Sequence, residues 1–406
     1  MPPEHETIHS FEEYYHKKKK PDDTWRLTVS TNKFQSGIVF LWLLIFSIPS
    51  PALSQAKWKG TVVKEGDLTV VRNPKGPLYE FPILELTEEL SLGGPDVQGD
   101  YAFGRLKDVV VDDSGSIYVL DQQNSHVKVF DAYGKCTRTI GRLGQGPGEF
   151  EGPMTLSLNR AAGELAVHQP YRMTFFKPDG TFLRDVSYRG SSTALGRVDS
   201  RGHIYLKELV MGDQDGPRFV TKKFGPDGSF LAELSGSPAP ISPKGATRIK
   251  VHTLMPASYF HFDQADNVVY GYPQTYDLML FRASDAKPFK KITRSYDPVE
   301  VASEEKKELE KEIPPGSGIE LDFPKHHPAY SRFFLSDLGH LFVQTYEKAD
   351  GGRVIYDIFD AEGRFIGRIP LKPSGFEILK GKYYALEEDE DGYQCVKRYA
   401  VTWKVS

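Results

Sequence analysis

Four histidines lie at comparable places within repeated strand-rich stretches, and they are the first candidates for chemistry. They are His168, His203, His261 and His340. If equivalent stretches surround a common axis, four imidazoles at matching positions could converge there and bind a metal ion such as Zn²⁺. The alternative is that each histidine forms local hydrogen bonds on its own turn or strand. We favour the local role, because the sequence offers no tight cluster of metal ligands.

Four aspartates near the start of turns that resemble Asp-x-x-Gly form a second matching set: Asp112, Asp199, Asp263 and Asp337. Carboxylates are the ligands that Ca²⁺ prefers. An aspartate that opens a turn, however, also bonds its own backbone two residues further on. We expect this turn-forming role, and we predict no cofactor. Ca²⁺ or Zn²⁺ in a central channel belongs only to an enzymatic alternative.

Signature sequences of several enzyme families are absent: the chain has no G-x-S-x-G, H-E-x-x-H or C-x-x-C. The glycine spacing of residues 141–150 superficially resembles a phosphate-binding loop, but the Lys-Ser/Thr pair and a following helix are missing. We expect these glycines to let the chain cross between repeated units, with Phe150 anchored in the core. Arg142 and Glu149 on this run are candidate ligand-binding residues at a channel mouth.

A second candidate ligand-binding segment, residues 325–330, lies in a long insertion. Adjacent side chains on an extended strand point in opposite directions, so His326 and His327 make a poor metal pair. Insertions on a rigid scaffold are nevertheless where binding residues concentrate. We therefore name Lys325, His326 and Tyr330 as binding candidates and assign no catalytic residue and no metal site. The alternative is a loop that only packs over the channel mouth.

Short strands separated by Asp/Asn/Gly turns would position these residues. Between Gly104 and Phe150, four apolar and β-branched runs alternate with turns; they are residues 106–111, 117–120, 127–130 and 137–140. Strands this short with frequent turns indicate an antiparallel four-stranded unit. Such a unit cannot bury both of its faces alone, so it needs neighbours of the same kind.

Copies of this unit follow through the rest of the chain. Five further stretches repeat the plan with a period of roughly 40 to 50 residues, although the fourth and sixth units are weak. Six such units predict an all-β fold, a six-bladed β-propeller with four-stranded antiparallel blades. A β-sandwich is the alternative, but sandwiches do not repeat their turns in phase.

The first unit resembles the NHL-repeat family. Residues 112–121 read D-x-x-G-x-I-Y-V-x-D, and residues 124–134 read N-x-x-V-x-V-F-D-x-x-G. Ser125 replaces the family's usual histidine, with His126 one place later. The longer context is similar to exported bacterial six-bladed β-propeller proteins, which carry runs like residues 141–150 and 70–74. This resemblance implies a fold much more firmly than an activity.

A ring of blades must be closed, because an open ring leaves strand edges unpaired. We predict that an N-terminal strand, Leu68–Arg72, completes the last blade, and that residues 82–92 are a candidate for a further outer or inner strand. Two insertions, 235–256 and 297–330, interrupt the repeat. Within the second, residues 302–312 predict a solvated surface helix that Ser303 caps.

The first 56 residues differ from the rest in composition. Residues 1–36 are polar and expected to be disordered. Residues 37–56 combine an apolar core at 38–46 with a Pro- and Ser-rich end, which predicts a secretory signal peptide. An uncleaved membrane anchor is the alternative, and a start site further downstream stays open. The propeller would comprise residues 57–406, in the periplasm or cell envelope.

Composition suits an exported globular protein with many turns. A net charge of −4 gives no reason to expect nucleic acid as a partner, and 12% aromatic residues with 37 glycines fit strands and turns. The two cysteines, Cys136 and Cys395, fall in the first and last blades, which are neighbours in a closed ring. A disulfide is conceivable in an oxidising compartment, but we favour two unpaired thiols.

One function is favoured over two alternatives. The favoured function is an exported, NHL-like propeller, a monomer without enzymatic activity, that binds a peptide, glycan or protein partner through one loop face. The first alternative is a propeller-type lyase or hydrolase with a metal in the central channel. The second is a membrane-anchored structural component of the envelope, and a membrane is an expected partner only if residues 38–46 are retained as an anchor.

Overall fold

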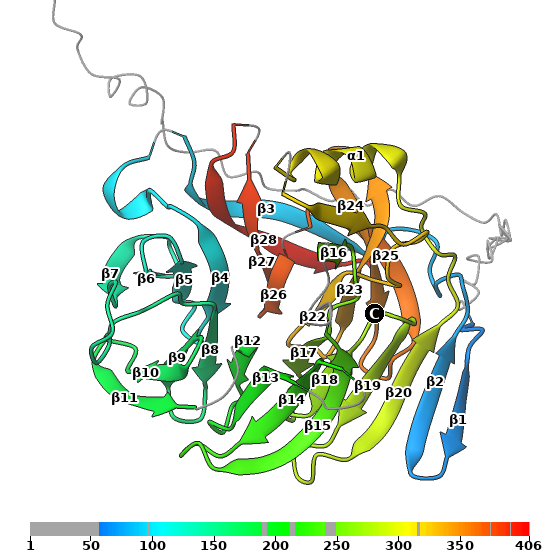
Figure 1. Cartoon of the computed structure of the whole chain (residues 1–406), viewed down its shortest axis with the longest axis horizontal. Helices are drawn as coiled ribbons and strands as arrows, with labels where there is room; N and C mark the ends of the chain where they lie inside the picture. Colours follow the sequence, from blue (N-terminus) through cyan, green and yellow to red (C-terminus); the bar gives the residue numbers. More distant parts are fainter. Residues whose placement is uncertain are drawn as a thin grey trace, which may run out of the picture. The chain divides into compact units, whose positions relative to one another are not determined.

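The repeated runs of β-branched and aromatic residues form strands, and the strands build six antiparallel blades of a β-propeller (Figure 1). The computed structural model describes residues 57–95, 97–188, 193–211, 216–239, 249–314, 317–373, 375–389 and 391–405. The predicted disordered segment 1–36 and the predicted signal peptide or anchor at 37–56 lie outside these residues. None of the helices that the structure describes is long and apolar enough to cross a membrane.

Each blade contains four consecutive or nearly consecutive strands, with the innermost strand first. Blades 1 to 3 are β4 (Leu106–Val111), β5 (Ile117–Asp121), β6 (His126–Phe130) and β7 (Cys136–Ile140); β8 (Thr155–Asn159), β9 (Glu164–Gln169), β10 (Arg172–Phe176) and β11 (Phe182–Ser187); and β12 (Thr193–Val198), β13 (Ile204–Val210), β14 (Arg218–Phe224) and β15 (Phe230–Pro238). Blades 4 to 6 are β17 (Tyr259–Phe262), β18 (Val268–Gly271), β19 (Asp277–Phe281) and β20 (Pro288–Arg294); β22 (Arg332–Leu335), β23 (Leu341–Ala349), β24 (Arg353–Phe359) and β25 (Phe365–Leu371); and β26 (Gly375–Leu379), β27 (Lys382–Glu388), β28 (Gln394–Trp403) and β3 (Leu84–Gly93).

An N-terminal strand closes the ring, as predicted, but it is β3. This strand pairs antiparallel with β28, from Leu84 opposite Trp403 to Gly93 opposite Cys395. The prediction that Leu68–Arg72 would complete the last blade is wrong. That stretch belongs to β2 (Leu68–Asn73), which runs parallel to β20 at the outer edge of blade 4, and the hairpin partner β1 (Thr61–Glu65) lies outside it.

A buried asparagine accounts for the place of β2. The Asn73 side chain donates to the carbonyl oxygens of Thr293 and Gly363 and accepts from the backbone N–H of Phe365 at 2.7 Å. These bonds fix the end of β2 to blades 4 and 5 at once. Alternating strand patterns do not reveal such partners, because every open blade edge accepts the same backbone pattern.

The faces of neighbouring blades form the hydrophobic core. Phe150, on the connection between β7 and β8, is fully buried in the cluster between blades 1 and 2, as predicted. Cys136 packs against the cluster between blades 6 and 1, and Cys395 is buried in blade 6. Both cysteines are free thiols, which agrees with the favoured interpretation.

The turns after the inner strands use aspartate as predicted. The Oδ1 atom of Asp112 accepts from the N–H groups of Ser114 and Ser116, both at 2.9 Å, and Asp199 and Asp263 do the same at their turns. In blade 5 the assignment of Asp337 to this role is wrong. Ser336 occupies the position, and its Oγ accepts the two turn N–H groups.

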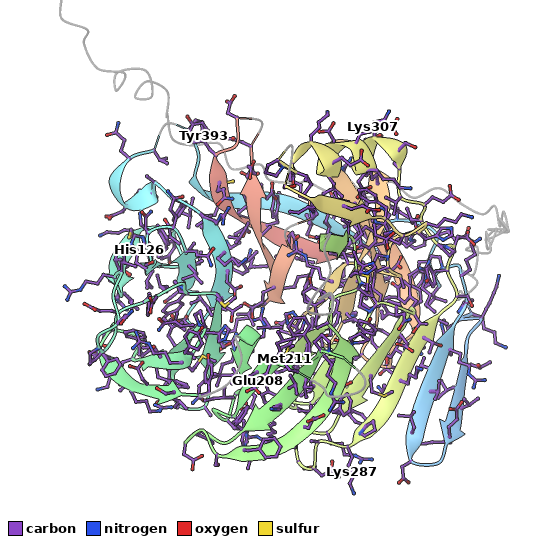
Figure 2. The ribbon with its side chains drawn as sticks, viewed as in Figure 1. His126, Glu208, Met211, Lys287, Lys307 and Tyr393 are labelled. Carbon is purple, nitrogen blue, oxygen red and sulfur yellow. The ribbon has the colours of Figure 1, made fainter. Side chains whose placement is uncertain are left out.

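Both insertions lie between blades and meet each other. The connection from β15 to β17 carries β16 (Ile249–His252), and the connection from β20 to β22 carries α1 (Ser303–Lys311) and β21 (Ile319–Asp322). β16 and β21 pair in parallel. The surface helix is confirmed: α1 has no buried residue, and its Lys307 is labelled on the outer side of the helix in Figure 2. The predicted Ser303 cap is wrong, because Ala302 is the N-cap residue.

Candidate functional site

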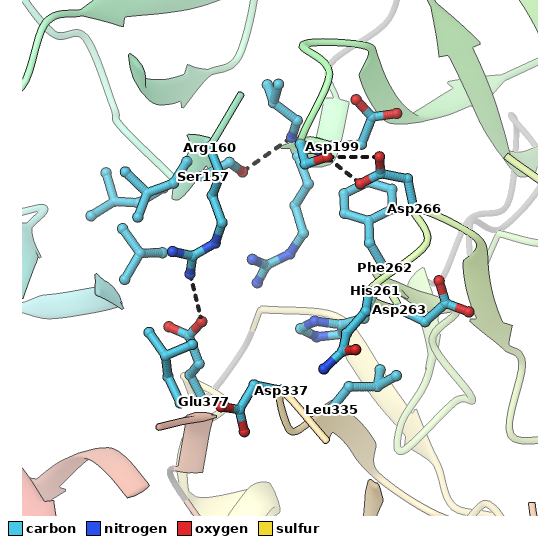
Figure 3. Close-up of a pocket in the computed structure, with 18 of the residues that line it drawn as sticks. Ser157, Arg160, Asp199, His261, Phe262, Asp263, Asp266, Leu335, Asp337 and Glu377 are labelled. Atoms are coloured by element: carbon cyan, nitrogen blue, oxygen red, sulfur yellow. Dashed lines mark hydrogen bonds and ion pairs between the residues drawn. The ribbon is translucent and has the colours of Figure 1, made fainter. Parts of the chain in front are cut away.

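One cavity of about 380 Å³ lies at the centre of the ring and is lined by the innermost strand of every blade (Figure 3). It lies toward the ends of these strands, where the Asp-containing turns follow. We call this end of the ring the turn face, and the other end, where connections pass from blade to blade, the crossover face. The volume is at the lower end of the range of about 300–1,000 Å³ that ligand pockets occupy.

Strand alternation brings polar side chains to this cavity. On the inner strands, Leu156, Val198 and Ile378 are buried between blades. Side chains point alternately to the two sides of a strand, so the residue directly before each of them turns toward the channel or along it. The cavity lining accordingly includes Arg197, Glu377 and, from blade 4, His261. Each stands two residues before the first turn residue of its blade.

Arg160, which follows β8, ties three blades together at the edge of the cavity. Its Nη1 donates to Asp113 at 2.9 Å, and its Nη2 donates to the carbonyl oxygen of Val111 at 3.0 Å and to Glu377 at 3.3 Å. Burial raises the pKa of Glu377 to about 7, although the charges of Arg160 and Arg197 oppose the rise. Figure 3 shows Arg160 and Glu377 facing each other across the cavity.

Arg197 and Asp108 form a second, looser pair. Asp108 is buried, and its two oxygens accept the backbone N–H groups of Val109 at 3.0 Å and Leu156 at 2.9 Å. Burial raises the pKa of Asp108, against the opposing charge of Arg197. The Nη2 atom of Arg197 stays 4.0 Å from Asp108, beyond hydrogen-bond distance. The buried Nε of Arg197 has no hydrogen-bond partner among the described residues.

His261 contributes a neutral imidazole. Its ring packs against Phe333 with centroids 5.6 Å apart. Burial, together with the charges of Arg197 and Arg332, lowers the pKa of His261 well below its usual value. A neutral imidazole has one donor and one acceptor, so this side chain can bond a hydroxyl or amide group in the cavity.

A close packing contact positions Arg197. Its neighbour Gly196 lies against the buried ring of His168 in blade 2, where an added Cβ atom would come within 2.3 Å of the ring. Thr155 also donates a hydrogen bond to the carbonyl oxygen of Gly196. Glycine is therefore required at this point of β12, and the contact with blade 2 fixes the strand that carries Arg197.

The four predicted histidines do not converge. Only His261 lines the cavity; His168 is fully buried in β9, His203 lies 2.9 Å from Asp199 on its turn, and His340 stacks on Trp403. This agrees with the favoured local roles. Within the part of the chain that the structure describes, no group of three or more His, Cys, Asp or Glu residues is arranged to hold a metal ion.

Arg142 and Glu149 lie together on the crossover face, away from the cavity. Arg142 donates to Glu149 at 2.8 Å, and Glu149 also accepts the backbone N–H of Gly146 at 2.9 Å. The Gly146 and Arg142 bonds lower the pKa of Glu149. In this arrangement the pair closes its own loop. Ligand binding by these two residues stays a prediction.

The other three candidates lie near one another on the second insertion but differ in exposure. Lys325 and His326 approach Glu300 at 3.8 and 3.9 Å and are accessible. Tyr330 is fully buried and donates to the carbonyl oxygen of Asp277 at 2.9 Å. Tyr330 thus anchors the insertion, whereas binding by Lys325 and His326 stays a prediction.

A second opening, of about 880 Å³, lies on the crossover face between blades 5, 6 and 1. Its polar lining is largely paired internally. Lys372 lies 3.2 Å from Glu387, Arg332 donates to Gln344, and Gln394 accepts the backbone N–H of Leu106 at 2.6 Å. The central cavity is the stronger candidate because it retains unused donors.

Comparisons with known proteins support the fold. Residues 98–177 match the model of a protein family described as 6-bladed beta-propeller. A candidate exported protein from Bacteroides fragilis NCTC 9343 has a TM-score of 0.54 and 13% identity, covering 83% of this chain and 100% of that chain. A member of the DUF4221 family from Bacteroides vulgatus ATCC 8482 has a TM-score of 0.51 and 12% identity, with 79% and 99% coverage. No curated protein matches the sequence significantly.

Proposed function

We propose that the protein binds a small polar ligand, or the narrow end of a peptide or glycan, in the central cavity on the turn face. The observation that carries this is a cavity to which all six inner strands contribute and in which Arg197 retains unused donors. Buried polar groups that serve structure alone are normally satisfied within the protein. A buried donor left without a partner supports a role for an external acceptor.

This proposal keeps the binding function favoured by the sequence and changes its location. The sequence directed attention to loops on the crossover face. The cavity instead offers enclosure, together with the neutral imidazole of His261 and the carboxyl of Glu377. Enclosure with a few fixed polar groups is the usual character of small-ligand sites.

A cavity-filling substitution tests the proposal. Val110 lines the cavity, so Val110→Phe should occupy part of its volume. Thermal unfolding of the full chain is followed with a panel of amino acids, dipeptides, and neutral and acidic sugars. We expect at least one compound to raise the melting temperature of the wild type in a concentration-dependent way, and Val110→Phe to abolish the rise.

The matched control is Val62→Phe on β1, where the valine is 57% exposed and lies outside the cavity lining. This variant should respond to the same compound as the wild type does. An undiminished response in Val110→Phe, or no response of the wild type to any compound, would contradict binding in the cavity.

Catalysis in the same cavity is a second candidate function. A carboxyl with a pKa near 7 suits general acid–base chemistry at neutral pH, and burial gives Glu377 this property. This candidate differs from the metal-dependent lyase or hydrolase considered from the sequence, because the proton transfer would rest on Glu377. Glu377→Gln would then abolish turnover of a bound compound while leaving its binding intact.

Export also belongs to the proposal. A signal peptide or anchor at residues 37–56 would deliver the propeller to the periplasm or envelope, and the similarity to a candidate exported protein accords with this. Sequencing the N-terminus of the mature protein distinguishes the two forms: a start near Lys57 indicates cleavage, and an intact Met1 indicates an anchor.

A further inference from the structure

The charged side chains around the cavity differ in whether their hydrogen-bonding groups are already used. Arg160 is committed to Asp113, Val111 and Glu377. The remaining carboxylates at the rim are likewise engaged within the protein: Asp199 and Asp263 by their turns, Asp266 by Ser200 and Arg201, and Asp337 by the N–H of Lys380. Among the described charged residues of the lining, Arg197 stands apart because its guanidinium makes no hydrogen bond.

Asp108 lies near Arg197 without taking up its donors. Both Asp108 oxygens are held by backbone N–H groups, and the nearest approach to the guanidinium is 4.0 Å. The carboxylate therefore offsets part of the arginine charge but leaves the planar group of N–H donors open. A guanidinium binds a carboxylate through two parallel hydrogen bonds when one edge is open in this way.

The surrounding charges favour a single negative charge on the ligand. Arg160 already faces two carboxylates, so Arg197 is the cation left to balance an incoming anion. Glu377, Asp108 and the rim aspartates would repel a doubly charged phosphate more strongly than a carboxylate. Toward the turn face the lining offers uncharged hydrogen-bonding groups, including His261, Ser157 and Gln264.

We infer that the cavity selects ligands that carry one carboxylate, which Arg197 binds through its guanidinium, with the hydroxyl or amide groups of the ligand directed toward the turn face. This inference rests on the proposed function and narrows it to one chemical class. Two sources supply such a ligand: an acidic sugar, or the C-terminal carboxylate of a peptide.

Matched pairs of probes test the inference by isothermal titration calorimetry on the full chain. One pair is galacturonate and galactose; the other is N-acetylalanine and N-acetylalaninamide. The members of each pair differ chiefly in the carboxylate. We expect the acid of at least one pair to bind about ten- to a hundredfold more tightly than its neutral partner, as hydrogen bonds to a charged group imply. The pair that shows the preference identifies the source.

Two substitutions at Arg197 locate the carboxylate. Arg197→Met should remove the preference for the acid, whereas Arg197→Lys, which keeps the charge but loses the planar pair of donors, should retain a reduced preference. Arg142→Met is the matched control, because Arg142 is 82% exposed on the crossover face, and it should behave as the wild type does. Its response also tests the earlier candidate site.

Several outcomes would overturn the inference. They are equal affinity for acid and neutral probes, wild-type preference in Arg197→Met, loss of preference in Arg142→Met alone, and no binding of either acid at millimolar concentration. Failure of the proposed function is distinguished by Val110→Phe. If a neutral compound binds the wild type and Val110→Phe abolishes that binding, the cavity is a binding site but the carboxylate class is wrong.

Discussion

Arg294 and Asp357 lie 2.8 Å apart at the contact between blades 4 and 5, whereas Arg197 and Asp108 stand 4.0 Å apart beside the cavity. Both aspartates are almost inaccessible, and burial raises the pKa of both. The two regions thus combine the same residue types and similar burial. They differ in what occupies the carboxylate oxygens.

Side chains of the neighbouring blade saturate Asp357. It accepts from Tyr276 at 2.6 Å, from Arg294 at 2.8 Å and from Arg368 at 2.8 Å, and Arg294 donates further to the carbonyl oxygen of Lys75. At Asp108, backbone N–H groups fill this role instead. Competition for the carboxylate oxygens therefore decides whether a buried arginine clamps two blades or remains available to a ligand.

The largest expected effect is at the clamp. Asp357→Asn should lower the free energy of unfolding by about 3–5 kcal/mol, because it leaves Arg294 and Arg368 without their shared counter-charge. Urea unfolding measures the loss. Asp285→Asn is the control: its partner Arg282 is 3.7 Å away and both side chains are about two-fifths exposed, so a change below about 1 kcal/mol is expected. A similarly small loss at Asp357 would refute the clamp.

A smaller, pH-dependent effect is expected at Glu377. Its folded-state pKa of about 7 lies above the ordinary 4.5, so the folded protein holds this proton more tightly than the unfolded chain does. The stability of the wild type relative to Glu377→Gln should therefore fall as pH rises from about 4.5 to about 7. The fall is at most about 3 kcal/mol, and less in practice because a quarter of the side chain is exposed.

Comparison with the glutamine variant cancels the titration of the buried histidines, which both proteins share. Burial lowers the pKa of His168 to about 3, which acts in the opposite direction by removing stability as pH falls below the ordinary value. Urea unfolding of both proteins at about pH 4.5 and about pH 8 gives the difference. An equal difference at the two pH values would show that Glu377 does not titrate in this window.

The smallest expected effect on stability is at the cavity. Arg197→Met should change the free energy of unfolding by less than about 1 kcal/mol, because Asp108 keeps both of its backbone hydrogen bonds. The measurement is again urea unfolding, made beside Asp357→Asn. A loss as large as that of Asp357→Asn would make Arg197 a structural residue and remove the contrast between the two pairs.

The sequence predicts the blades well because the signal for them is local. An aspartate that bonds the next turn residues leaves a repeated pattern, and six copies imply six blades. Long-range strand partners leave no such pattern, so Leu68–Arg72 was assigned to the wrong edge while β3 closed the ring. Ser336 was missed because its hydroxyl does the work of the expected aspartate.

The cavity could be predicted only in part. Alignment of the blades places Arg197, His261 and Glu377 at one position, two residues before the turn, which is a readable signal. His261 alone was singled out, since attention went to residue types that bind metals. That Arg160 is fully paired and Arg197 is open depends on distances between different blades, and no local pattern carries this information.

The pairing of β3 with β28 also has a consequence for how the chain folds. Glu88 and Lys397 form an ion pair across this seam, although 309 positions separate them in the chain. Contacts between such distant residues form slowly, so β3 is expected to wait without a partner until the last blade has been synthesised. A chain truncated before β26 would leave this ten-residue strand as an open edge, which is a site for aggregation. The last residues of the chain therefore protect one of its first strands.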